Sequence, residues 1–150
     1  MEFFQAERGR TFILRLEHGE ILHEEIEKFA KTKNVKAGIL IVVGGANKGS
    51  ELVVGPENRD EYPVSPMKYI LDDVHEAGGT GTLFPDEDGN PVVHIHISAG
   101  RNESTKTGCI REGVKVWEVM EIVLIELVYS KGKRIFDEKT GLKLLKPEGE

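Results

Sequence analysis

The sequence predicts an α+β fold, in which one main helix packs on a mixed or largely antiparallel sheet of about seven to eight strands. Residues 19–34 form the one substantial segment with helical periodicity. Short β-prone runs separated by loops rich in Gly, Pro and Asn fill most of the remaining chain. At 150 residues the chain has the length of a single domain spanning 1–150, with a mobile tail expected at 146–150.

The amino-terminal part predicts a strand followed by the helix. Residues 11–16 are a short β-prone run, and the helical pattern opens after them. Charged residues occupy the face opposite to the apolar one, and the helix is expected to end near Asn34. The apolar residues that recur at helical spacing are Leu22, Ile26, Phe29 and Ala30.

Three strands are expected next. Residues 37–43 are a nearly continuous apolar run, which is typical of a buried strand. Two shorter strands are expected at residues 51–54 and 67–71. The loop at 55–66, which contains Pro and Asn, separates them.

The middle of the chain predicts a glycine-rich strand at 74–83, joined by a hairpin loop at 86–90 to a second strand at 92–98. Three glycines in the first strand indicate a bulge, a bend or a close approach of backbones: Gly78, Gly79 and Gly81. Residues 101–107 are expected to form a polar turn. Residues 119–129 are apolar on both alternating faces, as expected of a central strand.

Charge and cysteine content narrow the possible partners and locations. The net charge of -6 disfavours nonspecific binding to a phosphate backbone, because lysine and arginine must replace its counterions. The single cysteine excludes an internal disulfide and fits a reducing compartment, so we expect a cytoplasmic protein. No apolar run approaches the ~20 residues that a membrane-spanning helix needs, so no membrane partner is expected.

A pair of histidines is the clearest chemical signal. Alternation along a strand places His94 and His96 on one face, roughly 7 Å apart. Two imidazoles on one face are the beginning of a metal site; the alternative is two histidines bonded to neighbours or water. Cys109 follows thirteen residues after His96, a spacing that permits a turn and a return on the adjacent strand. Its thiolate would leave a fourth tetrahedral position open, as in catalytic zinc sites; the alternative is a small buried hydrophobe.

Four further residues are candidates for the same region. His75 is a possible fourth ligand, and Glu76 a possible proton-transfer group. Neighbours in a strand face opposite ways, so at most one of them points at a metal, and the alternative is an exposed strand end. Arg101 and Arg111 are candidates to hold an anionic substrate; the alternative is that both are solvated turn residues.

The pattern of glycines and histidines resembles the PPC domain (plants and prokaryotes conserved, also called DUF296) over about residues 8–130. The opening segment Arg15-Leu16-Glu17-His18-Gly19-Glu20 and the pair Gly44-Gly45 fit it. The segments that carry the resemblance most strongly are Gly79-Thr80-Gly81-Thr82, Gly89-Asn90-Pro91-Val92-Val93-His94-Ile95-His96, Gly100-Arg101, Gly108-Cys109 and Glu112-Gly113.

The resemblance implies one helix against a mixed sheet, assembled as a homotrimer. The family pattern carries a His-x-His and a later Gly-His, and Cys109 stands where that later histidine is usual. A cysteine can still bind zinc. The fold of the family is also similar to that of acetolactate decarboxylase, a zinc enzyme with a three-histidine site. Plant relatives carry AT-hooks, whereas this chain has no credible AT-hook.

Together with the resemblance, which implies the homotrimer, these observations predict a PPC protein that holds zinc or another divalent metal through His94, His96 and Cys109, with His75 as a possible extra ligand. One alternative is a DNA-binding or protein-scaffold module, for which the charge predicts little DNA retention at physiological salt. Another is a metal-dependent lyase or hydrolase acting on a small anionic carbonyl compound. In that case Glu76 would be the acid or base, and Arg101 or Arg111 would hold the anion.

Overall fold

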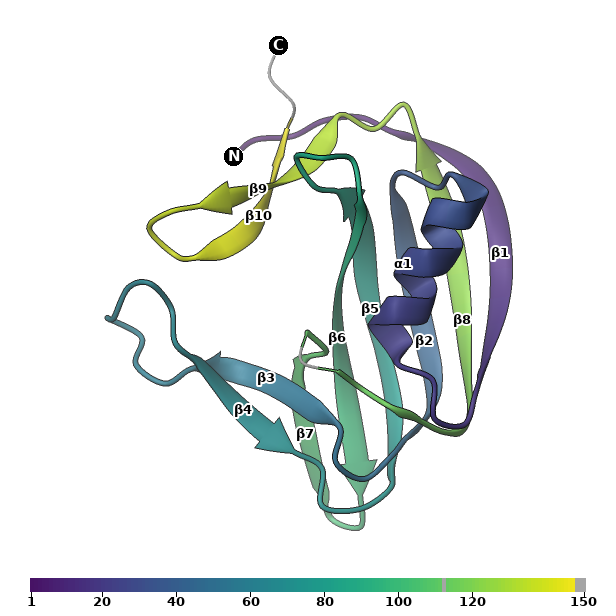
Figure 1. Ribbon diagram of the computed structural model, residues 1–150, viewed down its shortest axis with the longest axis vertical. Coiled ribbons are helices and arrows are strands. Elements are labelled where there is room, and N and C mark those ends of the chain that lie inside the picture. The colour runs from purple at the N-terminus through teal and green to yellow at the C-terminus, as the bar shows by residue number, and fades with distance from the viewer. Residues whose placement is uncertain (112, 148–150) are drawn as a thin grey trace.

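The structure, a computed structural model, describes residues 1–111 and 113–147. Eight strands form one sheet in the order β1-β8-β2-β5-β6-β7-β3-β4, and all neighbouring pairs are antiparallel (Figure 1). A second sheet pairs β9 with β10. The elements are β1 (Glu7–Glu17), α1 (Leu22–Lys33), β2 (Gly38–Ala46), β3 (Glu51–Pro56), β4 (Pro66–Ile70), β5 (His75–Pro85), β6 (Pro91–Arg101), β7 (Ser104–Cys109), β8 (Val116–Val128), β9 (Gly132–Asp137) and β10 (Leu142–Pro147).

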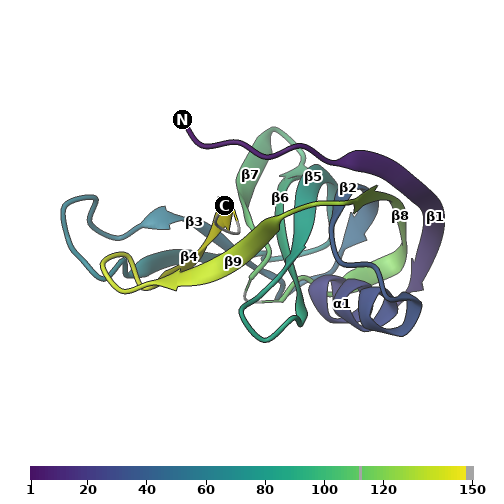
Figure 2. The same cartoon turned by 90° about the horizontal axis from the view of Figure 1, so that it is seen from above.

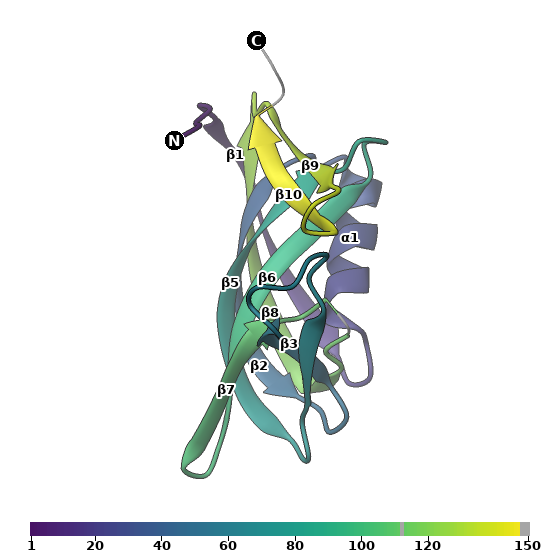
Figure 3. The same ribbon diagram turned by 90° about the vertical axis from the view of Figure 1, so that its left-hand side faces the viewer.

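Helix α1 packs against one face of the sheet, on the right in Figure 3. Its buried positions are Leu22, Ile26 and Ala30, so the predicted apolar stripe faces the strands. Asn34 ends the helix in the left-handed conformation, at φ 52°, where its backbone N–H still reaches helical carbonyls. In the described part of the chain no helix is long and apolar enough to cross a membrane.

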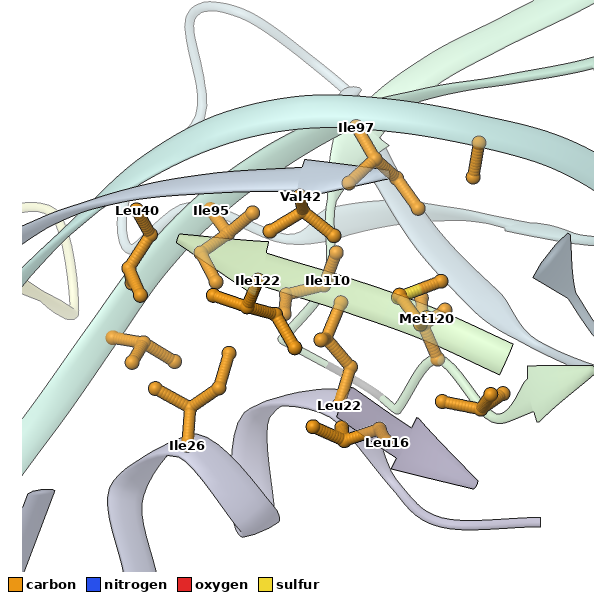
Figure 4. Close-up of a cluster of buried hydrophobic side chains, with 14 of the residues drawn as sticks. Leu16, Leu22, Ile26, Leu40, Val42, Ile95, Ile97, Ile110, Met120 and Ile122 are labelled. Atoms are coloured by element: carbon orange, nitrogen blue, oxygen red, sulfur yellow. The ribbon is translucent and has the colours of Figure 1, made fainter. Parts of the chain in front are cut away.

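The core lies between α1 and the inner face of the sheet (Figure 4). Strand β8 lies between β1 and β2, so the strand expected to be central is inside the sheet, next to the edge strand β1. The histidine strand β6 contributes Ile95 and Ile97, both fully buried. Because side chains alternate along β6, burial of these isoleucines directs His94 and His96 to the opposite, outer face.

Two glycines of β5 let the backbone of β6 come unusually close. A Cβ atom built on Gly79 would lie 2.1 Å from the carbonyl oxygen of His96. One built on Gly81 would lie 2.5 Å from the carbonyl oxygen of His94. Of the three interpretations of the glycine-rich strand, close backbone approach is the one that the structure shows, and it occurs along the histidine strand itself.

Two parts of the chain are more regular than the sequence predicts. The expected polar turn at 101–107 is reduced to Asn102 and Glu103, and the polar residues after it form β7. The strands β9 and β10 were not predicted, because charged residues interrupt the alternation of apolar and polar side chains in both. Their backbone hydrogen bonds come from pairing with each other. Of the tail expected to be mobile, Lys146 and Pro147 lie in β10, and residues 148–150 are outside the described residues.

Candidate metal centre

Three side chains with metal-binding atoms converge on the outer face of the sheet. Strands β6 and β7 pair so that His96 lies directly opposite Cys109. The turn and return on the adjacent strand is therefore confirmed. The ligand atoms of His94, His96 and Cys109 all lie within 4.8 Å of one another. No other group of three or more His, Cys, Asp or Glu residues close enough to hold a metal was found among the described residues.

The geometry of the donors fits a small divalent ion. The Nε2 atoms of His94 and His96 are 3.1 Å apart. Two nitrogens bound to tetrahedral zinc at ~2.0–2.1 Å are separated by about 3.3 Å, so little movement is needed. Two imidazoles and a thiol are donors that favour zinc. Calcium and magnesium take oxygen ligands instead. Without an ion, one of the two Nε2 atoms donates a hydrogen bond and the other accepts it.

The surroundings keep His94 neutral. Its burial lowers the pKa of the imidazole to about 4, and the positive charges of Arg134, His96 and Arg111 act in the same direction. A neutral imidazole presents a free nitrogen lone pair, which is the form that binds a metal. Cys109 is buried, with 6% of its surface exposed.

Two cavities meet at this cluster. One, of about 380 Å³, extends toward α1 and β9; the other, of about 430 Å³, extends toward β3 and β4. Figure 2 shows the β3–β4 and β9–β10 hairpins projecting from the same side of the molecule. They are joined where the backbone N–H of Val64 donates to the carbonyl of Thr140 at 3.0 Å. The cavities share His94, Cys109, Arg111, Gly141 and Leu142.

Three of the residues predicted for this region lie elsewhere in the fold. His75 is on the opposite, buried face of β5, where its Nδ1 is 2.9 Å from the carbonyl oxygen of Asp73. Glu76 pairs with Gly100, four residues along β5 from the residue that pairs with His96, which is about 13 Å. Arg101 is bound to Asp73 at 2.6 Å. The reason is the hairpin register, which places residues 75, 76 and 101 at the far end of the sheet.

Arg134 is a site residue that the sequence did not predict. It belongs to β9 and lines the cavity of about 380 Å³ together with His94 and Arg111. Only 4% of its surface is exposed. The signal available in the sequence was the short run around Ile135 and Phe136, but a lone arginine in such a run is normally solvated.

The sequence also matches a known family. Residues 4–128 match the Plants and Prokaryotes Conserved (PCC) domain, also abbreviated PPC. The chain belongs to this family. A PPC protein from Pyrococcus horikoshii has a crystal structure with a TM-score of 0.83 and 27% identity, covering 97% of both chains.

Two other proteins are informative comparisons for this PPC domain. A crystal structure of a metal-containing protein from Archaeoglobus fulgidus has a TM-score of 0.82 and 27% identity, covering 96% of this chain and 98% of that one. The bifunctional protein GlmU from Synechococcus sp. (strain JA-3-3Ab) is 29% identical over 133 residues, which are 88% of this chain and 20% of that protein. The chain therefore spans about a fifth of the length of that relative.

Proposed function

We propose that this PPC protein binds a divalent metal ion, zinc, through Nε2 of His94, Nε2 of His96 and Sγ of Cys109. The convergence of these three atoms within 4.8 Å carries the proposal. The metal content of the A. fulgidus protein, which is 27% identical, supports it. Three protein ligands leave a fourth position for water or a small molecule, where a bound zinc ion acts as a Lewis acid.

Metal analysis of the purified protein tests the site. We expect about one zinc ion per chain after dialysis, measured by inductively coupled plasma mass spectrometry. His96→Ala is expected to lower zinc affinity by ~100-fold, because ~10–16 kcal/mol for a four-ligand site corresponds to ~3 kcal/mol per ligand. His18→Ala is the matched control, because His18 lies outside the cluster and accepts a hydrogen bond from the backbone of Glu118. Equal zinc affinity in His96→Ala and the unmodified protein would falsify the site.

We further propose that the protein assembles as the homotrimer implied by the family resemblance. The outer sheet face supports self-association, because it carries exposed aliphatic side chains on β1 and β2. Ile41 pairs with Val123, and Val123 pairs with Ile13 on the other side of β8. An apolar row of this kind on an open face is typical of an interface. The exposed members are Ile13, Ile39, Ile41 and Val43.

Light scattering after size-exclusion chromatography tests the trimer. We expect a mass of about three times 16.7 kDa. Ile41→Glu is expected to shift the protein to monomers, because a charge on the apolar row must be desolvated in the interface. Ile70→Glu is the matched control: Ile70 is also exposed but lies on the edge strand β4. A monomeric unmodified protein, or a trimer unaffected by Ile41→Glu, contradicts this interface.

An enzymatic role is a second candidate, favoured by the cavities that adjoin the cluster. In this role Arg111 is a candidate to hold the anion of a small carbonyl compound, whereas Glu76 and Arg101 are too remote. The similarity to acetolactate decarboxylase stays a prediction. DNA binding is less favoured, because the net charge is -6. A candidate DNA-binding protein from Bacteroides thetaiotaomicron has a similar fold (TM-score 0.76, covering 96% of this chain and 99% of that one) but is only 17% identical.

A further inference from the structure

We propose that the cavity of about 380 Å³ binds the oxyanion of a small organic molecule, a carboxylate or a phosphate, through the guanidinium groups of Arg134 and Arg111. This inference goes beyond metal binding and does not depend on it, because both cations belong to the chain itself.

Arg134 carries a positive charge that no carboxylate of the described residues neutralises. Its Nη2 donates to the hydroxyl of Thr82 at 2.9 Å and its Nε to the carbonyl of Val92 at 3.4 Å. Its guanidinium also lies 6.0 Å from the ring centre of Phe84. All three partners are neutral, and the side chain is buried. A buried charge without a counter-ion is costly, so the arrangement favours an anion from outside the chain.

Two further groups enter the same cavity from other elements. Arg111 follows β7 and lines the same cavity as Arg134, so two like charges face one space; burial and then the charge of Arg111 lower the pKa of Arg134. His23 comes from α1, and its Nδ1 is buried without a hydrogen-bond partner in the described residues. An oxyanion would relieve the repulsion and could accept from this imidazole.

Among the described residues one carboxylate lines the cavity, that of Glu27, and its Oε1 accepts from the backbone N–H of Val93 at 3.0 Å. Its single negative charge is outnumbered by the guanidinium groups of Arg134 and Arg111. Lys143 also lines the cavity and is bound to Asp86 at 3.1 Å. With a metal bound, the negative charge of the Cys109 thiolate is offset by the divalent ion; without a metal, the two guanidinium groups still carry the site.

The remaining residues that line the cavity indicate the chemistry of the rest of the ligand. Side chains around the two arginines are apolar, so the molecule should carry a small apolar part next to its anionic group. These residues are Val92, Ile110, Phe136 and Leu142.

Titrations with benzoate, benzamide and inorganic phosphate test this site, on zinc-loaded and on chelator-treated protein, by NMR of arginine Nε signals. Benzoate and benzamide share a shape but differ in charge. We expect benzoate to bind at least about tenfold tighter than benzamide, with shifts at Arg134 and Arg111. Tighter binding of phosphate than of benzoate would assign the oxyanion to a phosphate.

Matched variants complete the test. Arg134→Gln and Arg111→Gln should each weaken benzoate binding about tenfold or more, whereas Arg101→Gln should leave it unchanged, because Arg101 is bound to Asp73. If Arg134→Gln does not fold, benzoate binding by Arg111→Gln and the comparison of benzoate with benzamide test the anion site. The inference is overturned if benzamide binds as tightly as benzoate, or if neither anion binds. Benzoate binding to a protein that takes up no zinc overturns the metal site and leaves the anion site standing.

Discussion

Replacing Gly79 by alanine is expected to destabilise the protein by about 3 kcal/mol or more, at the upper end of the cost of overpacking. The new methyl group would lie 2.1 Å from the carbonyl oxygen of His96 and 2.8 Å from the Cα of Ile97. Both atoms belong to the backbone, so no change of rotamer relieves the clash. Strand β6 must move away from β5, and His96 moves with it.

Gly78→Ala is the matched control for this prediction. Gly78 is the preceding residue of the same strand, and a methyl group added there would meet the Val42 carbonyl oxygen at 3.8 Å, an ordinary contact. Its stability should stay within about 1 kcal/mol of the unmodified protein, because the loss of glycine's freedom in the unfolded chain is favourable. Urea unfolding followed by circular dichroism measures both variants. Equal midpoints would mean that β5 and β6 tolerate a side chain between them.

Removing the metal is expected to lower the melting temperature by roughly 5–10 °C. An ion that binds the folded state at a free concentration ~100 times its dissociation constant stabilises it by about 2.7 kcal/mol. For a domain of this size each kcal/mol corresponds to roughly 2–4 °C. The ion would join β6 to β7, because His96 and Cys109 are cross-strand partners.

Differential scanning calorimetry with zinc and with a chelator measures this effect. In Cys109→Ser and His94→Ala the difference between the two conditions should largely disappear, because each change removes one of three ligands. His18→Ala should keep the full difference, because His18 is remote from the cluster. A chelator-sensitive melting temperature that persists in His94→Ala would place the stabilising ion elsewhere.

Local sequence patterns predicted the elements whose secondary structure depends least on tertiary contacts. The spacing of Leu22, Ile26 and Ala30 specifies a helix with one buried face wherever that helix packs. The apolar run of β8 favours a strand inside the sheet, and β8 pairs with β1 on one side and with β2 on the other. Strands β9 and β10 were not predicted, because their stability comes from partners and not from their own alternation.

The period of two along β6 was enough to place His94 and His96 on one face, and the family pattern was enough to identify the domain. Strand pairing determined the remainder of the site, because contacts between distant segments depend on register and not on local periodicity. Register brings Cys109 opposite His96 and carries His75 and Glu76 to the far end of the sheet. The return of the chain through β9 buries Arg134 in the same cavity as His94, a placement that no local pattern encodes.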